Sequence, residues 1–109
     1  MADPLHVFNP TFRSWATYLD DDLETPRLIV KTGFLVDLGP EQWPTHLHNF
    51  WVYNGRHELL GTLEPLRPES EKMRRFKFHR HADLQYVELP GAYWDMEGVI
   101  EELMRHPLS

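Results

Sequence analysis

The run from His48 to Leu63 constrains the fold of this chain most, because it has the pattern of a β-hairpin. Residues 48–53 are rich in aromatic and β-branched side chains, which favour strands. The next two residues, Asn54-Gly55, form the pair preferred in type I′ turns, since both tolerate positive φ. A return strand from about residue 57 to Leu63 completes the pattern. Because so short a turn joins only antiparallel strands, the sequence predicts an antiparallel sheet.

Three further segments have the pattern of strands. Residues 27–38 are partly apolar on both faces, which is typical of a central strand. In residues 75–81, two phenylalanines alternate with one lysine and two histidines, which predicts one buried and one solvated face. Residues 84–89 form a short further strand, and we expect a tight turn at Ala82-Asp83 before it.

Two segments have apolar residues at helical spacing. The first starts at Asn9-Pro10, an N-cap residue followed by proline at the first helical position, and predicts a helix from about Pro10 to Leu19. The second follows Asp95, which can cap a helix, and ends before Pro107. The apolar face of this second helix consists of Met96, Val99, Ile100, Leu103 and Met104.

Together these patterns predict a single α+β domain spanning residues 1–109. We expect a mainly antiparallel sheet of about four to five strands, with an N-terminal and a C-terminal helix packed on one face. A chain of 109 residues has the usual size of one domain. It contains no cysteine, which excludes disulfides, thiolate metal sites and cysteine nucleophiles.

The charge of the chain is distributed unevenly. The net charge is −6, yet residues 72–81 hold five basic residues and no acid. The remainder has 6 basic and 17 acidic residues, a net charge of −11. An acidic body argues against nucleic-acid binding, in which phosphate contacts supply most of the affinity. It fits instead a protein partner with a basic surface.

Two features of the chain bear on its location. No apolar run approaches the ~18 residues that suggest a membrane span. The N-terminus also lacks the basic-then-apolar layout of a secretory signal. We therefore expect a cytoplasmic protein with no membrane partner.

The acidic segment around residues 18–24 is the candidate binding site. Acids interleaved with apolar side chains suit docking onto a basic surface such as a nuclease cleft. The candidate contact residues are Tyr18, Asp20, Asp21, Asp22 and Glu24, with Trp43 as an aromatic anchor in a predicted loop. The alternative interpretation of the segment is a solvated loop after the first helix.

The chain contains no recognisable catalytic motif. It has no phosphate-binding glycine loop, no Gly-x-Ser-x-Gly and no His-Glu-x-x-His. The leading hypothesis is therefore a non-catalytic protein–protein interaction domain without a cofactor. Small acidic domains of this type act as immunity proteins, antitoxins, inhibitors or accessory subunits.

A repeated His-x-His pattern gives a second hypothesis, a small metal-binding protein or metalloenzyme. One copy is His46-Leu47-His48 and the other is His79-Arg80-His81. Residues two apart on a strand point to the same side, so each copy can offer two imidazoles together. If the two copies lie on adjacent strands, they can bind a divalent transition metal such as zinc.

The basic segment, residues 72–81, gives a third hypothesis, an RNA-binding or RNA-cleaving domain. Phe76 and Phe78 would then stack on bases, and His79, Arg80 and His81 would be the catalytic candidates. The strand alternation favours a different interpretation, in which both phenylalanines face the core and the arginines pair with the acidic surface.

Overall fold

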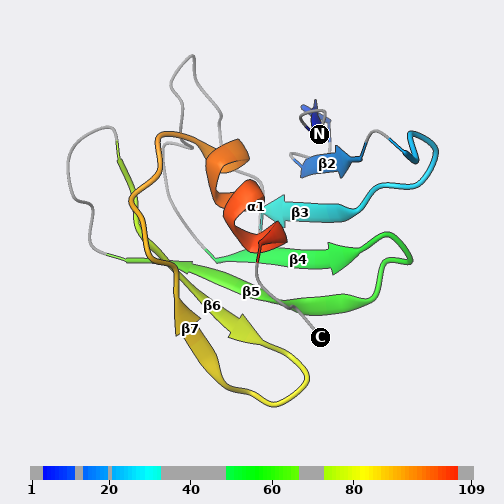
Figure 1. Cartoon of the computed structure of the whole chain (residues 1–109). Coiled ribbons are helices and arrows are strands. Elements are labelled where there is room, and N and C mark those ends of the chain that lie inside the picture. Colours follow the sequence, from blue (N-terminus) through cyan, green and yellow to red (C-terminus); the bar gives the residue numbers. More distant parts are fainter. Residues whose placement is uncertain (1–3, 12–13, 20, 33–48, 67–72, 106–109) are drawn as a thin grey trace.

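A computed structural model of the chain describes residues 4–11, 14–19, 21–32, 49–66 and 73–105. Across these residues, seven strands form one antiparallel sheet in chain order, and one helix packs on it (Figure 1). Each strand pairs with its neighbours in the sequence, so the sheet is a meander. The elements are β1 (Leu5–Asn9), β2 (Ser14–Tyr18), β3 (Leu28–Thr32), β4 (Phe50–Asn54), β5 (Leu59–Pro65), β6 (Phe76–Arg80), β7 (Tyr86–Glu88) and α1 (Met96–Met104).

The core lies between α1 and one face of the sheet. The cross-strand register places alternate residues of β3 to β6 on this face, where they are buried, as expected for a sheet covered on one side. From the sheet and the segment after β7, the core contains Leu28, Val30, Phe50, Val52, Leu63, Phe76, Phe78 and Leu89. From the helix it contains Met96, Val99, Ile100 and Leu103.

The opposite face of the sheet is covered by no described helix. A cross-strand row on this face runs from Lys31 through Trp51, Thr62 and His79 to Tyr86. Trp51 and Tyr86 are exposed, and the other three residues are half-buried. We call this side of the sheet the open face.

The predicted N-terminal helix is wrong, because residues 5–9 and 14–18 are the paired strands of the β1–β2 hairpin. In the turn, Asn9 Oδ1 accepts a hydrogen bond from the Thr11 backbone N–H at 2.9 Å. The same bond pattern serves an N-cap and an Asx turn, so Asn-Pro does not distinguish the two. Trp15 and Thr17 face the core two residues apart, and Trp15 packs against Phe50 with ring centroids 6.2 Å apart. Tertiary packing therefore selects the strand over the helical spacing.

The predicted count of four to five strands is also too low, because this hairpin adds two strands to the sheet. The remaining strand predictions are confirmed within the described residues. β3 lies inside residues 27–38, of which 33–38 are outside the described part. β6 buries Phe76 and Phe78 and leaves its alternate residues half-buried, as the alternation predicts. β7 lies inside residues 84–89.

The β4–β5 hairpin is confirmed, but its turn is not type I′. Neither Asn54 nor Gly55 has a positive φ, and the left-handed residue is His57, with φ 64°. The His57 N–H donates to the Asn54 carbonyl at 3.0 Å, and the Asn54 N–H donates to the Glu58 carbonyl at 3.0 Å. The loop therefore has three residues and ends in a left-handed residue, the next most common hairpin connection.

The C-terminal helix is confirmed with the predicted cap. Asp95 has extended backbone angles, and its Oδ1 accepts a hydrogen bond from the Gly98 N–H at 3.0 Å. Glu97 lies in the first turn, where a negative charge stabilises the helix dipole. Four of the five predicted apolar residues are buried, and Met104 is half-buried against the core. No helix in the described residues is long and apolar enough to cross a membrane.

Candidate functional site

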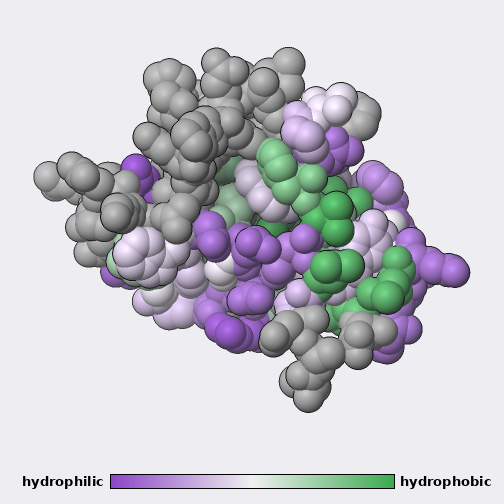
Figure 2. Space-filling model, turned by 90° about the horizontal axis from the view of Figure 1, so that it is seen from above, coloured by the Kyte–Doolittle hydropathy of each residue, from purple (hydrophilic) through white to green (hydrophobic). Residues whose placement is uncertain are grey.

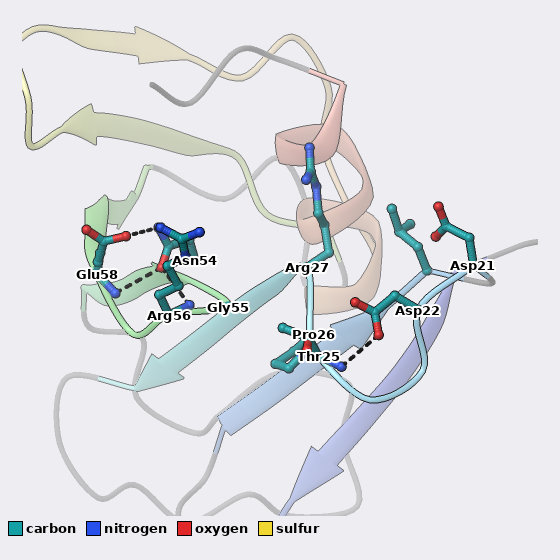
Figure 3. Close-up of a pocket in the computed structure, with 10 residues that line it drawn as sticks. Asp21, Asp22, Thr25, Pro26, Arg27, Asn54, Gly55, Arg56 and Glu58 are labelled. Carbon is teal, nitrogen blue, oxygen red and sulfur yellow. Dashed lines mark hydrogen bonds between the residues drawn. The ribbon is translucent and has the colours of Figure 1, made fainter.

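A pocket of about 400 Å³ lies between two loops at one end of the sheet (Figure 3). One wall comes from the described part of the β2–β3 connection, residues 19 and 21–27, and the other is the β4–β5 turn, residues 54–58. Register explains why the two loops meet. Leu28, the first residue of β3, pairs with Asn54, the last residue of β4, so both loops leave the sheet at the same end.

The two walls approach each other most closely at Gly55. A Cβ atom at this position would lie 2.3 Å from the carbonyl oxygen of Pro26 and 3.0 Å from the Thr25 side chain. Real Cβ contacts are essentially never that short with a backbone atom. Glycine is therefore required here by the close approach of a second loop.

The β2–β3 connection has a defined shape although it is exposed. Asp22 Oδ1 accepts hydrogen bonds from the backbone N–H groups of Glu24 and Thr25, both at 3.1 Å. The Asp22 N–H donates to the carbonyl of Leu19 at 3.1 Å, and the Arg27 N–H donates to the carbonyl of Thr17 at 2.6 Å. An aspartate that bonds the backbone two and three residues ahead fixes a turn. We call the described residues of this connection, 19 and 21–27, the acidic loop.

The opposite wall is organised by Asn54. Its Oδ1 accepts hydrogen bonds from the N–H groups of Arg56 at 2.9 Å and Glu58 at 3.0 Å. Its Nδ2 donates to Glu58 Oε1 at 2.9 Å, which holds the Glu58 carboxylate beside the turn. The side chain of Asn54 therefore stabilises the turn through hydrogen bonds, while the residue with a positive φ is His57.

The chemistry of the pocket is ionic. The residues that line it include three acids, Asp21, Asp22 and Glu58, and two bases, Arg27 and Arg56. These side chains are exposed, and the apolar contribution comes from Leu19 and Pro26. An open pocket with an excess of carboxylates suits the charged end of a basic side chain, with the two arginines available to acids beside it.

Comparisons with known proteins do not assign the chain to a family. No protein-family model, curated protein or solved structure matches the chain. The function therefore has to be argued from the residues themselves.

Two of the residues predicted to bind a partner line this pocket. Asp21 and Asp22 line it, and Glu24 is exposed on the same loop. Tyr18 ends β2, half-buried opposite Leu5 of β1. Two further predicted residues, Asp20 and Trp43, lie outside the described part of the chain.

The predicted metal ligands are not tested as a set. His46 and His48 lie outside the described residues. His79 lies on the open face, where its Nε2 is 3.2 Å from Glu64 Oε2, and His81 is exposed in the turn after β6. No group of three or more His, Asp or Glu side chains suited to a metal occurs where the structure describes the chain. The zinc-type site stays a prediction.

The basic segment packs as its alternation predicts. Phe76 and Phe78 are buried in the core and are not available for base stacking. Arg75 pairs with Glu88 at 3.1 Å, and Arg80 pairs with Asp83 at 3.0 Å. The Lys77 amine lies over the Tyr86 ring, 4.3 Å from its centroid. Much of the charge of this segment is therefore matched locally.

No local pattern in the sequence predicts the polar relay that His6, Thr17 and Glu101 form between the N-terminal hairpin and α1. His6 of β1 contacts Thr17 Oγ1 through Nδ1 at 2.9 Å and Glu101 Oε1 through Nε2 at 3.2 Å. A carboxylate, an imidazole and a hydroxyl in line resemble the arrangement that activates a nucleophile. Thr17, however, has 0% of its surface exposed, so its hydroxyl cannot meet a substrate. The relay serves packing, and the separation of 95 positions between His6 and Glu101 explains why no local pattern predicts it.

Proposed function

We propose that this chain is a non-catalytic interaction domain whose acidic loop binds a protein with a basic surface. The observation that carries the proposal is the way this loop combines charge, shape and exposed apolar surface. Asp21, Asp22 and Glu24 are exposed, and Asp22 fixes the backbone between them. Leu23, among these acids, keeps 60% of its surface exposed.

An exposed leucine surrounded by carboxylates has the composition of a small docking site. The apolar centre gains affinity when water is excluded from it, and the charged rim steers the partner and sets its orientation. The pocket beside the loop supports the same interpretation. Its acidic residues can receive an arginine or lysine of the partner, while Arg27 and Arg56 are available to acidic residues of the partner. This role corresponds to that of an immunity protein, antitoxin, inhibitor or accessory subunit.

The test removes the charge of the loop and keeps its shape. The triple variant Asp21→Asn, Asp22→Asn, Glu24→Gln retains the oxygen that Asp22 uses as an acceptor. The full chain is used as bait in extract of its native host, and a retained basic protein is purified and titrated against both forms by calorimetry. Each exposed charge contributes about 0.5–1 kcal/mol, so we expect the Kd to rise ~10-fold to ~100-fold.

A matched control removes the same number of exposed acids elsewhere. Asp83→Asn, Glu88→Gln and Glu97→Gln leave the net charge equal to that of the loop variant. We expect this control to bind within about 2-fold of the unmodified chain, because screening confines charge effects to about 8 Å at physiological salt. Equal weakening by both variants, or no weakening by the loop variant, would contradict the proposal.

A further inference from the structure

Residues of both charges line the pocket between the acidic loop and the β4–β5 turn, yet they do not pair with one another. Arg27 comes from the acidic loop and Arg56 from the turn. In the described part of the chain, neither guanidinium takes part in an ion pair or a hydrogen bond, and the carboxylate of Asp21 has no partner either. The chain has 17 acidic and 11 basic residues, so carboxylates are not scarce. The unmatched arginines are therefore a property of this site.

The other described arginines all have a polar partner, which sets these two apart. The partners are the Met73 carbonyl for Arg74, Glu88 for Arg75, Asp83 for Arg80 and Glu102 for Arg105. The two arginines without a partner come from separate loops and line the same pocket. Because a guanidinium matches a carboxylate through two parallel hydrogen bonds, this pair is suited to a carboxylate of a ligand.

The acids of the pocket lie on both sides of Arg27. Figure 3 shows the Arg27 side chain extending between the two walls, with Arg56 and Glu58 on one side of it and Asp21 and Asp22 on the other. In Figure 2, hydrophilic side chains follow the edge of the molecule at the end that carries both loops, which lies on the right in Figures 1 and 2. A ligand that matches this lining carries a positive and a negative group close together.

We propose that the pocket binds a basic C-terminal residue of the partner protein. Its α-carboxylate pairs with Arg27 and Arg56, and its side-chain cation lies against the acids of the lining. This inference rests on the proposed function for the identity of the partner, a protein with a basic surface. The volume of about 400 Å³ is at the lower end of the range for ligand pockets and suits the end of a chain.

The charge pattern selects this occupant over others. A nucleic acid or a phosphate would bring its negative charge against Asp21, Asp22 and Glu58, which repel it. A basic side chain within a partner's sequence would leave both arginines unmatched. At a C-terminal arginine or lysine, a single residue carries both a carboxylate and a cation. Binding of a terminal carboxylate is a recurring mode of peptide recognition.

The test compares two peptides that differ only in the terminal carboxylate. Acetylated Gly-Gly-Arg with a free carboxylate and its C-terminal amide are each titrated into the full chain, and binding is followed by NMR shifts of the backbone amides of residues 54–58. We expect the amide to bind at least ~10-fold more weakly, because it loses the charge-assisted hydrogen bonds.

Two double variants show whether the pocket arginines cause this difference. In Arg27→Gln, Arg56→Gln, the two peptides should bind within about 2-fold of each other. The control, Lys77→Gln, Arg105→Gln, removes the same charge from residues that do not line the pocket, and it should keep the preference for the free carboxylate.

Glu58 tests the cationic end of the ligand without any change in the acidic loop. Glu58→Gln keeps the oxygen that accepts the bond from Asn54 Nδ2 and removes the charge. We expect this variant to reduce the preference for Gly-Gly-Arg over Gly-Gly-Leu, both acetylated and with a free carboxylate, by ~2-fold to ~5-fold.

Equal affinity for the acid and the amide overturns the proposal, and so does a preference that survives the double arginine variant. Tighter binding of free arginine than of the peptide would also reject a chain terminus as the ligand. The proposed function is tested separately, by titrating the acidic-loop triple variant with the protein partner. If the peptides fail while that variant still weakens partner binding, the inference about the pocket alone is rejected.

Discussion

At the scale of single residues, the absence of a side chain at Gly55 shapes the candidate site. Its φ is negative, so the turn itself does not demand glycine. The demand comes from the Pro26 carbonyl oxygen, which a Cβ atom would approach to 2.3 Å. Any residue larger than glycine at position 55 would therefore force the two walls of the pocket apart.

We expect Gly55→Ala to push the two walls of the pocket apart and to lower the free energy of unfolding by about 1–3 kcal/mol. The matched control is Gly98→Ala in α1, where the new Cβ would meet no atom closer than 3.6 Å. That change should raise stability by about 0.5–1 kcal/mol, since alanine is the better helix former. Urea denaturation measures both, and equal stability of Gly55→Ala and the unmodified chain would rule out the close approach.

Tyr93 makes the stability of the chain depend on pH at alkaline values. Burial of the phenol, helped by the negative charge of Glu102, raises its pKa above the usual 10.0, although a hydrogen bond from the Gly91 N–H acts the other way. A raised pKa in the folded state means that the unfolded chain loses this proton first. The contribution is fully present below about pH 10 and is lost as the pH rises through the folded pKa.

Replacing Tyr93 by phenylalanine tests that linkage. Tyr93→Phe also removes the hydrogen bond from Gly91, so we expect it to be less stable than the unmodified chain near neutral pH by about 0.5–1.5 kcal/mol. Between pH 9 and pH 11 the difference in thermal midpoint should narrow, because only the unmodified chain loses the contribution of the neutral phenol. A difference that stays constant over this range would contradict the assignment.

At the scale of elements, the His6 relay ties the N-terminal hairpin to α1. The hairpin lies at one end of the meander, and His6 reaches both Thr17 of β2 and Glu101 of the helix. Since Thr17 is fully buried, removal of the imidazole would leave its hydroxyl without this partner in the core. A buried polar group without its partner costs more than the bond itself contributes.

We expect His6→Ala to lower the free energy of unfolding by about 2–4 kcal/mol, from the lost bonds and the orphaned hydroxyl. Adding Thr17→Val should recover about 1 kcal/mol or more, because the orphaned group is then absent. His81→Ala, at an exposed turn, is the control and should change stability by less than about 0.5 kcal/mol. Strictly additive effects of the two substitutions in urea denaturation would show that the His6–Thr17 bond contributes nothing to stability.

At the scale of the whole molecule, the sheet is covered on one side and carries its charge unevenly. The pairs Arg75–Glu88 and Arg80–Asp83 reduce the positive field of the basic segment, so the acidic character of the body dominates the surface. The affinity of the acidic loop for its partner should therefore fall as salt is raised.

The acidic segment is exposed where the structure describes it, and its role in binding a partner stays a prediction. The spacing of acids and leucines marked residues 18–24 as a binding segment, and Asp21, Asp22 and Glu24 are exposed there. For the opposite wall of the pocket, from Asn54 to Glu58, the sequence predicts a turn and no binding role. A pocket formed by loops about 30 residues apart in the chain depends on strand register, and the sequence does not display that register.

The sequence by itself determined the elements whose signals are local. The helix after Asp95 needs only its cap and its apolar repeat, and β6 needs only its alternation, so both were predicted correctly. The tertiary structure decided the N-terminal segment, where Asn9-Pro10 and the apolar spacing fit a helix and a hairpin equally. Pairing of β2 with β3 and packing of Trp15 on Phe50 favour the strand. The physical reason is that strand pairing is non-local, and its energy comes from neighbours that no window of the sequence contains.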